Sequence, residues 1–92
     1  MKLKEVKCIA DAMLEKKGQN VISLDLKPIG TAISDYFLVC NADSTTNVLA
    51  IADNVEDRMI VECGRKVVRA QVKDNAIWVI LDYGDIVVHI FQ

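Results

Sequence analysis

The sequence predicts a small α+β domain, in which two helices lie on one face of a mixed sheet of about five strands in the order αββαβββ. Two stretches repeat apolar residues at helical spacing, and five short stretches have the apolar, β-branched composition of strands. Tight turns join the last three strands. Because 92 residues supply one core of modest size, we expect residues 1–92 to form a single domain.

Both predicted helices are amphipathic and have recognisable ends. Residues 3–17 place apolar side chains three and four residues apart, with lysines in the last turn and Gly18 as the C-cap. The second helix follows capping oxygens at 43–45 and ends at Gly64. Its apolar positions are Val48, Ile51, Ala52, Val55 and Met59. Each helix therefore has one face to bury against a sheet.

The predicted strands differ in how they alternate. They are residues 20–26, 36–40, 66–72, 76–81 and 86–91. The first places Ile22, Leu24 and Leu26 on one side, which predicts a strand with one solvated face. The second is apolar on both alternations, which predicts a central strand covered on both sides.

Composition and charge limit the classes of function. The net charge is −2 with no basic stripe, so we expect no direct sequence-specific nucleic acid binding, and a macromolecular partner is expected to be basic. The longest apolar runs are about five residues, far below the roughly 20 that span a bilayer, so no membrane role is expected. Three scattered cysteines without a CxxC pair indicate reduced thiols. Because no transit-like leader is present, we expect a bacterial cytoplasmic protein rather than an organellar one.

The motifs of common enzymes are absent. There is no phosphate-binding loop and no dinucleotide fingerprint, and the lone His89 offers no metal cluster, so we expect no cofactor and no metal. The αβ pattern resembles nucleotidyltransferase-like domains, which hold magnesium with a DxD pair, but no DxD occurs here. An acid/base pair stays open, although nothing positions a nucleophile beside it. Its candidate members are Asp25, Asp35, Asp82 and Asp85.

Three segments in order closely resemble the ribosomal silencing factor family, also called the Iojap-like proteins (RsfS). They are LDL (24–26), SDYFLVCNADSTTNVLAIADNVED (34–57) and WVILDYGDIVVHIFQ (78–92). The resemblance implies a nucleotidyltransferase-like sheet without catalytic acids, in a protein that is not an enzyme. It also implies binding to large-subunit ribosomal protein fourteen (uL14) at the intersubunit face, which blocks joining of the subunits and represses translation. The alternative is a large-subunit assembly factor that uses the same interface, and the remote alternative is a nucleotidyltransferase-like enzyme.

The sequence departs from the family pattern in two places. Residues 41–47 read NADSTTN where relatives often carry a threonine-glycine-threonine-serine stretch followed by arginine and histidine. Contacts of that basic pair are therefore not carried over. Relatives usually continue past the equivalent of Gln92 into a helical tail, so we expect the family's C-terminal tail to be missing. A homodimer stays open, because tail contacts are not assumed.

The candidate partner-binding residues gather around the stretch from Trp78 to Asp82. Trp78, Ile80 and Asp82 share one side of their predicted strand, and we expect this side to meet another molecule. Tyr83 is expected at its rim. The opposite side is assigned to the core under the helices, and its residues are Ile77, Val79 and Leu81.

For several other polar residues, a structural role in a turn or strand is an alternative to a role in binding or catalysis. Asp35 and Tyr36 enter the central strand, where an interface role and a structural role are equally favoured. Asp82 and Asp85 also suit turn chemistry, and Gly84 suits the turn's backbone. His89, inside an apolar strand, is read as structural.

Overall fold

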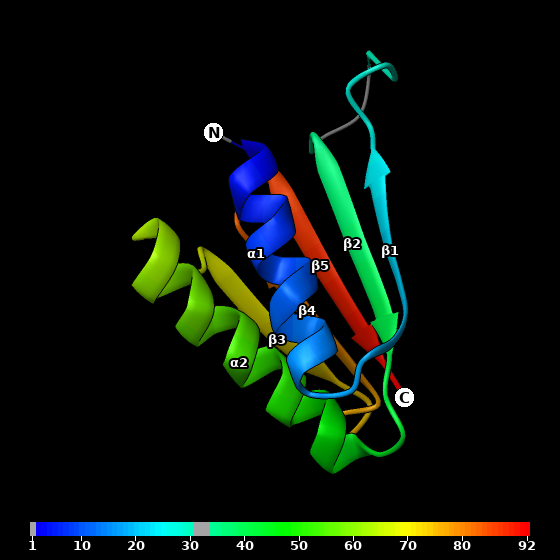
Figure 1. Ribbon diagram of the computed structural model, residues 1–92. Helices are drawn as coiled ribbons and strands as arrows, with labels where there is room; N and C mark the ends of the chain where they lie inside the picture. Colours follow the sequence, from blue (N-terminus) through cyan, green and yellow to red (C-terminus); the bar gives the residue numbers. More distant parts are fainter. Residues whose placement is uncertain (1, 31–33) are drawn as a thin grey trace.

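The computed structural model describes residues 2–30 and 34–92 and contains the seven predicted elements in the predicted order (Figure 1). The helices are α1 (Lys2–Glu15) and α2 (Thr45–Cys63). The strands are β1 (Gln19–Asp25), β2 (Tyr36–Asn41), β3 (Arg69–Lys73), β4 (Trp78–Asp82) and β5 (Ile86–Phe91). The predicted α+β class and the order αββαβββ are confirmed.

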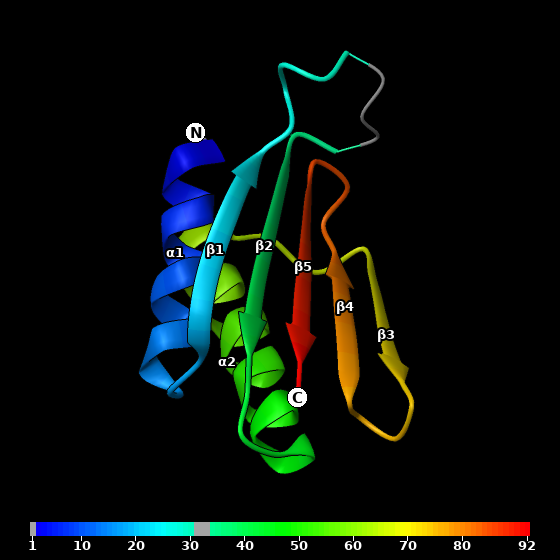
Figure 2. The same ribbon diagram turned by 90° about the vertical axis from the view of Figure 1, so that its right-hand side faces the viewer.

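The five strands form one mixed sheet in the order β1-β2-β5-β4-β3. The central pair, β2 and β5, is parallel, and every other pair is antiparallel. In Figure 2 the sheet is turned toward the viewer, and both helices lie behind it. Residues 2–30 and 34–92 therefore form two layers, and within these ranges one face of the sheet carries no helix.

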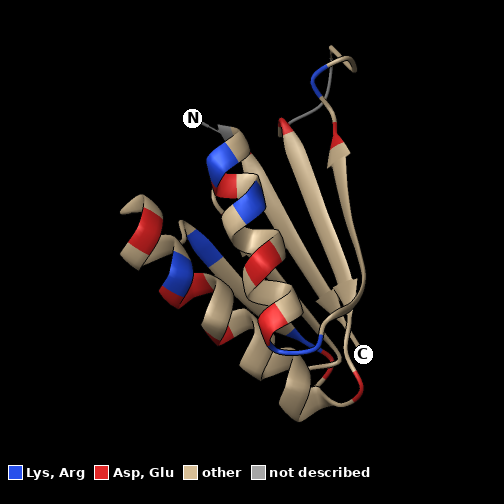
Figure 3. Cartoon of the chain, in the orientation of Figure 1, with Lys and Arg blue, Asp and Glu red and all other residues tan. Residues whose placement is uncertain are grey.

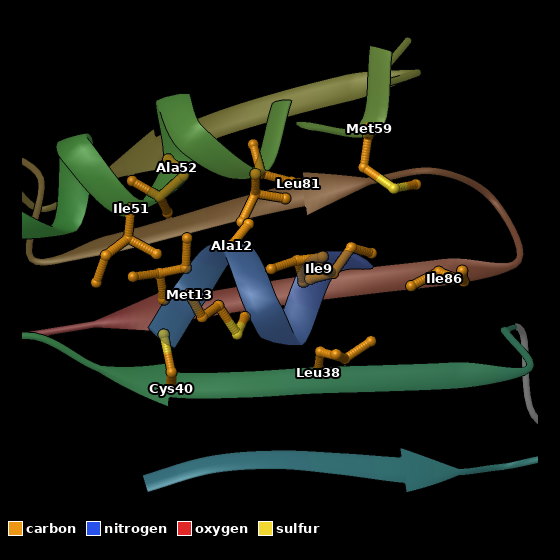
Figure 4. Close-up of a cluster of buried hydrophobic side chains, with 14 of the residues drawn as sticks. Ile9, Ala12, Met13, Leu38, Cys40, Ile51, Ala52, Met59, Leu81 and Ile86 are labelled. Atoms are coloured by element: carbon orange, nitrogen blue, oxygen red, sulfur yellow. The ribbon is translucent and has the colours of Figure 1, made fainter. Parts of the chain in front are cut away.

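The core fills the space between the helices and the sheet. Alternate residues of β2, β4 and β5 are buried, and the buried residues of α1 and α2 meet them. Figure 4 shows Ile9 and Met13 from α1 pointing between α2 and the strands that carry Leu38 and Leu81. Each of these four side chains is almost fully buried, and burial of an aliphatic side chain this large contributes about 1.5–3 kcal/mol.

The ends of α2 lie where the sequence predicts them, whereas the C-terminal end of α1 does not. The Ser44 hydroxyl accepts from the amide of Asn47 at 3.1 Å, and Gly64 closes the helix in the left-handed conformation with φ 63°. Helix α1 ends at Glu15, so Lys16 lies beyond it in the following turn rather than in the helix.

A close approach of backbone, rather than the predicted C-cap conformation, explains Gly18. Lys17 occupies the left-handed region with φ 64°, and the amide of Gly18 donates to the carbonyl of Met13 at 2.8 Å. A Cβ on Gly18 would lie 2.8 Å from that same carbonyl oxygen. Only glycine fits this turn without displacing backbone.

Strand β1 turns its apolar side away from the helices. Ile22 pairs with Val39 and Leu24 with Phe37, so these residues share the uncovered side of the sheet. Ile22 is 51% exposed and Leu24 is 46% exposed. The alternation was predicted correctly, but the apolar side is the one that faces solvent.

Two further expectations about coverage are wrong. Strand β2 is covered on one side only, because both helices pack on the same face and leave its other residues half-buried. Ile77 was assigned to the core but is exposed, since it lies in the turn before β4. Val79 and Leu81 are buried as predicted.

Candidate functional site

The uncovered side of the sheet, here called the open face, has an apolar centre. Its members follow from the strand register, because paired residues project to the same side. They are Ile22, Leu24, Phe37, Val39, Asn41, Val87, His89, Phe91, Trp78, Ile80 and Asp82, with Arg69, Gln71 and Lys73 on β3. Apolar side chains thus run across four adjacent strands, and the side chains of β3 on this face are polar.

Four rings pack against one another at the centre of the open face. The centre of the Trp78 ring lies 5.4 Å from the centre of the Phe91 ring and 6.0 Å from that of His89, and both pairs are stacked. Phe37 lies 5.2 Å from His89 on the opposite side, in a tilted arrangement. Such contacts add about 0.5–1.5 kcal/mol per pair beyond area burial. The rings therefore form a preordered platform rather than four independent side chains.

His89 is held in one tautomer by its neighbour. The indole Nε1–H of Trp78 donates to Nδ1 of His89 at 3.3 Å, which places the ring proton of neutral His89 on Nε2. Burial lowers the pKa of His89 below its ordinary value of 6.5. The imidazole thus remains neutral near pH 7 and orients the indole, as expected for a structural histidine.

Charged groups border the platform on two sides. The Lys73 ammonium lies 5.1 Å from the centre of the Trp78 ring, on the β3 side. Asp82 lies at the other end of β4, where its Oδ1 accepts from the amide of Gly84 at 2.7 Å. Gly84 has φ 90°, a conformation that favours glycine. The expected turn chemistry of Asp82 and Gly84 is confirmed.

A cavity of about 540 Å³ continues the open face beyond Phe37. It is lined by Leu26, Ile29, Ser34, Phe37, Asp82, Gly84 and Val87. Its walls are mostly apolar, and Asp82 is the only charged residue among them. The Ser34 hydroxyl donates to the carbonyl of Gly84 at 3.0 Å and so ties the segment before β2 to the β4–β5 turn.

Asp85 has a structural role on the helix side of the same turn. Its carboxylate pairs with Arg65 at 2.9 Å, and Arg65 also contacts Glu5 at 2.8 Å and donates to the Tyr83 carbonyl at 2.6 Å. The carbonyl of Asp85 accepts from the amides of Asp35 and Tyr36. Asp85 thus joins the β4–β5 turn to α1, to the segment after α2 and to β2.

The predicted site residues fall on both sides of the sheet. Trp78, Ile80 and Asp82 lie together on the open face, half-buried, as the alternation predicted. Tyr83 does not rim this face and is only 2% exposed. The expected place of Tyr83 is wrong, because the alternation of β4 continues one residue past Asp82 and places Tyr83 on the buried side with Val79 and Leu81. The amide of Tyr83 donates to the carbonyl of Ile86 at 2.8 Å.

Tyr36 is also absent from the open face. Tyr36 is 5% exposed and lies on the side of Leu38, under the helices. Its hydroxyl accepts from the Lys27 ammonium at 2.8 Å. Asp35 is half-buried just before β2. The position of Tyr36 favours the structural reading, so Tyr36 does not belong to the candidate contact surface. The interface role expected of Asp35 stays a prediction.

Sequence reasoning missed most of the open face outside β4. Phe37, His89 and Phe91 supply three of the four rings, and Ile22 and Leu24 widen the surface. The missing information was the sheet order, which places β5 between β2 and β4. The same-side alternation of Val87, His89 and Phe91 was visible in the sequence and was a usable signal.

The described residues contain neither a cluster of metal-ligating side chains nor a helix suited to crossing a membrane. No group of three or more His, Cys, Asp or Glu side chains within residues 2–30 and 34–92 is placed to hold a metal ion. Over the same ranges, no helix is long and apolar enough to cross a membrane. The free thiols of Cys8 and Cys40 are buried, and burial raises the pKa of each to about 11.

The chain thus has a two-layer α+β fold with an aromatic platform on the uncovered face of its sheet. The family described as "Ribosomal silencing factor during starvation" matches residues 2–92. The ribosomal silencing factor RsfS of Bacillus subtilis is 37% identical over 87 residues, which are 95% of this chain and 72% of the relative. RsfS of Chromobacterium violaceum is 31% identical over 91 residues, covering 98% of this chain and 73% of the relative.

Solved structures agree with the sequence relatives. A crystal structure of a Chromobacterium violaceum protein has a TM-score of 0.87 at 30% identity, over 100% of this chain and 76% of that chain. One from Bacillus halodurans has a TM-score of 0.85 at 32% identity, over 98% of this chain and 82% of that chain. The chain belongs to the ribosomal silencing factor (RsfS) family.

Proposed function

We propose that this protein silences ribosomes by docking its open face on large-subunit ribosomal protein fourteen (uL14), which blocks joining of the subunits. The observation that carries the proposal is the uncovered aromatic platform, in a chain of the ribosomal silencing factor family. A small domain rarely leaves a broad apolar surface in water unless that surface meets a partner. The outward side of β1 supports the same conclusion, because Ile22 and Leu24 extend this surface to the edge of the sheet.

The open face has the composition of an interface with an apolar centre and a polar border. Trp78 belongs to its ring platform, and tryptophan is among the residues that most often dominate binding energy. Asp82 lies where a basic group of a ribosomal protein can pair with it, beside the apolar cavity. The rings are already stacked in the free protein, so little side-chain entropy is lost on docking.

The proposed action requires no chemistry from the chain. Repression follows from occupying the subunit-joining surface, so the protein acts as a binding partner rather than as an enzyme. We place this activity in the bacterial cytoplasm, in line with the bacterial origin of the relatives. The assembly-factor alternative uses the same surface and differs in the particle bound, so comparing affinity for precursor and mature large subunits separates the two.

Co-sedimentation with isolated large subunits tests the proposal. Trp78→Ala is expected to weaken binding by about thirtyfold, since truncation of an interface tryptophan that dominates binding costs about 2 kcal/mol or more. The matched control is Val61→Ala on α2, which removes an 81% exposed side chain far from the open face. A light-scattering assay of subunit joining should show inhibition by wild type and by the control, but not by Trp78→Ala.

Two results would refute the proposal. One is unchanged large-subunit binding by a Trp78→Ala protein whose circular dichroism spectrum shows native folding. The other is a wild-type protein that binds large subunits without inhibiting joining. Sedimentation of the free protein shows separately whether the open face pairs two copies, because Trp78→Ala would then convert a dimer to a monomer.

A further inference from the structure

A second uncovered apolar surface lies on the helix side of the sheet, at its β3 edge. Helix α1 packs on β1 and β2, whereas α2 packs on β4 and β5. Five strands about 4.8 Å apart span about 24 Å, and two helices about 10 Å apart cover about 20 Å. The helix layer is therefore about one strand too narrow, and no helix lies behind β3 in Figure 2.

The uncovered strip is apolar. Ala70 and Val72 pair with Leu81 and Val79, so they project to the helix side, yet Val72 is 60% exposed. Val68, two residues before Ala70, is exposed as well, and its amide donates to the Asp82 carbonyl at 2.9 Å.

The flank of α2 that borders this strip also carries exposed apolar side chains. Asn54 and Arg58 contact α1 through Ala12 and Glu15, which fixes the flank that faces α1. Leu49 and Ile60 lie on the opposite flank by the helical period, and both are exposed. This flank of α2 and the helix side of β3 together form a ledge, whose members are Leu49, Ile60, Val68, Ala70 and Val72.

Negative charge borders the ledge along α2, which carries acidic residues on several turns (Figure 3). Asp53 and Glu56 lie on the ledge flank, and Asp57 follows on the outer face. None of the three forms an ion pair within the described part of the chain. Burial raises the pKa of Glu56, and repulsion from Asp53 and Asp57 adds to it. A cation placed here would relieve that repulsion.

We propose that the ledge binds a basic amphipathic helix of a partner protein, which completes the helix layer over β3. The apolar stripe of that helix packs on the ledge, and its lysines or arginines face the acidic flank of α2. Strand β3 has five residues and is about 17 Å long, which matches about eleven helical residues. The ledge lies on the side of the sheet opposite the open face, so the two surfaces can be occupied together.

A titration of the full chain with a model peptide tests the proposal. The probe is a peptide of about fourteen leucines and lysines with a helical apolar period, compared with a version in which glutamate replaces every lysine. Amide resonances of α2 and β3 are expected to shift with the lysine peptide and not with the glutamate peptide. Asp53→Lys with Glu56→Lys should reverse this preference.

Two neighbouring residues supply matched variants. Ile60→Lys places a charge on the ledge and should weaken binding of the lysine peptide about tenfold or more. Val61→Lys adds the same charge about 100° around the helix and should change binding by less than about twofold. Both side chains are exposed, so both variants should fold. Large-subunit binding should be unchanged in each, which separates this test from that of the open face.

Several outcomes would overturn the proposal. They are equal weakening by the two variants, shifts that map to the open face, and no binding of the lysine peptide up to about 1 mM. If Ile60→Lys instead converts a dimer of the free protein to a monomer in sedimentation, the ledge binds a second copy and the basic-helix assignment is wrong.

Discussion

Tyr83 carries a buried hydroxyl without a hydrogen-bond partner within the described residues, and Tyr83→Phe removes only that oxygen. Burial raises the pKa of Tyr83, as expected for a phenol removed from water. An unpaired buried polar group costs about 1–3 kcal/mol. Part of that cost is offset by the packing contacts of the oxygen, so we expect Tyr83→Phe to stabilise the protein by about 1 kcal/mol.

Tyr36 is the matched control, because it is almost as buried but its hydroxyl is paired. Its oxygen accepts from the Lys27 ammonium at 2.8 Å. Tyr36→Phe loses this bond and should destabilise by about 1 kcal/mol. The two identical substitutions are thus expected to act in opposite directions, although the sequence placed Tyr83 at the rim of the contact surface and left an interface role open for Tyr36.

Thermal and urea unfolding measure both effects. In a domain of this size, about 1 kcal/mol moves the Tm by about 4–8 °C. Binding of Tyr83→Phe to large subunits should equal that of wild type, since the hydroxyl lies under the helices. A loss of about 1 kcal/mol in Tyr83→Phe, or a weaker complex with large subunits, would refute the assignment of Tyr83 to the core.

Three further substitutions test local features. Gly18→Ala should destabilise by about 1–3 kcal/mol in urea unfolding, because its Cβ would meet the Met13 carbonyl at 2.8 Å; no loss would show that the turn opens freely. Ser44→Ala removes the N-cap of α2 and should cost about 1 kcal/mol in the same assay, whereas a neutral result would mean that the cap is replaced by water. The pKa of His89 is lower in the folded protein than its ordinary value of 6.5. As the pH falls below 6.5, the unfolded chain therefore binds a proton at His89 before the folded chain does, and the free energy of unfolding decreases. His89→Gln should reduce this loss between about pH 7 and pH 5, and an identical pH dependence in both proteins would contradict the buried neutral imidazole.

The local pattern of the sequence was sufficient for the elements and for the side of β4 that is uncovered. Trp78 and Ile80 were placed correctly because period-two alternation is a local property. The N-cap of α2 was predicted within residues 43–45, where the structure has Ser44, and its end at Gly64 was predicted as well, since each depends on a few neighbouring residues.

Properties that depend on sheet order and on the number of helices were not predictable. The apolar side of β1 faces solvent because β1 is an edge strand, and its apolar residues pair with the residues of β2 that lie on the uncovered side of the sheet. No local pattern in the sequence reveals this pairing. The ring cluster joins Phe37 to His89 through the parallel pairing of β2 with β5. Tyr83 was misplaced for a different reason, because alternation was not extended one residue past Asp82.

The central claim is that the open face is the surface that meets ribosomal protein fourteen. Calorimetric titration of the isolated ribosomal protein with Leu24→Ser tests it most directly, because Leu24 is 46% exposed and contributes little to folding. We predict native stability within about 1 kcal/mol and binding weakened about tenfold, with Val61→Ser as the unaffected control. Equal affinity of wild type, Leu24→Ser and Trp78→Ala for that protein would contradict the account.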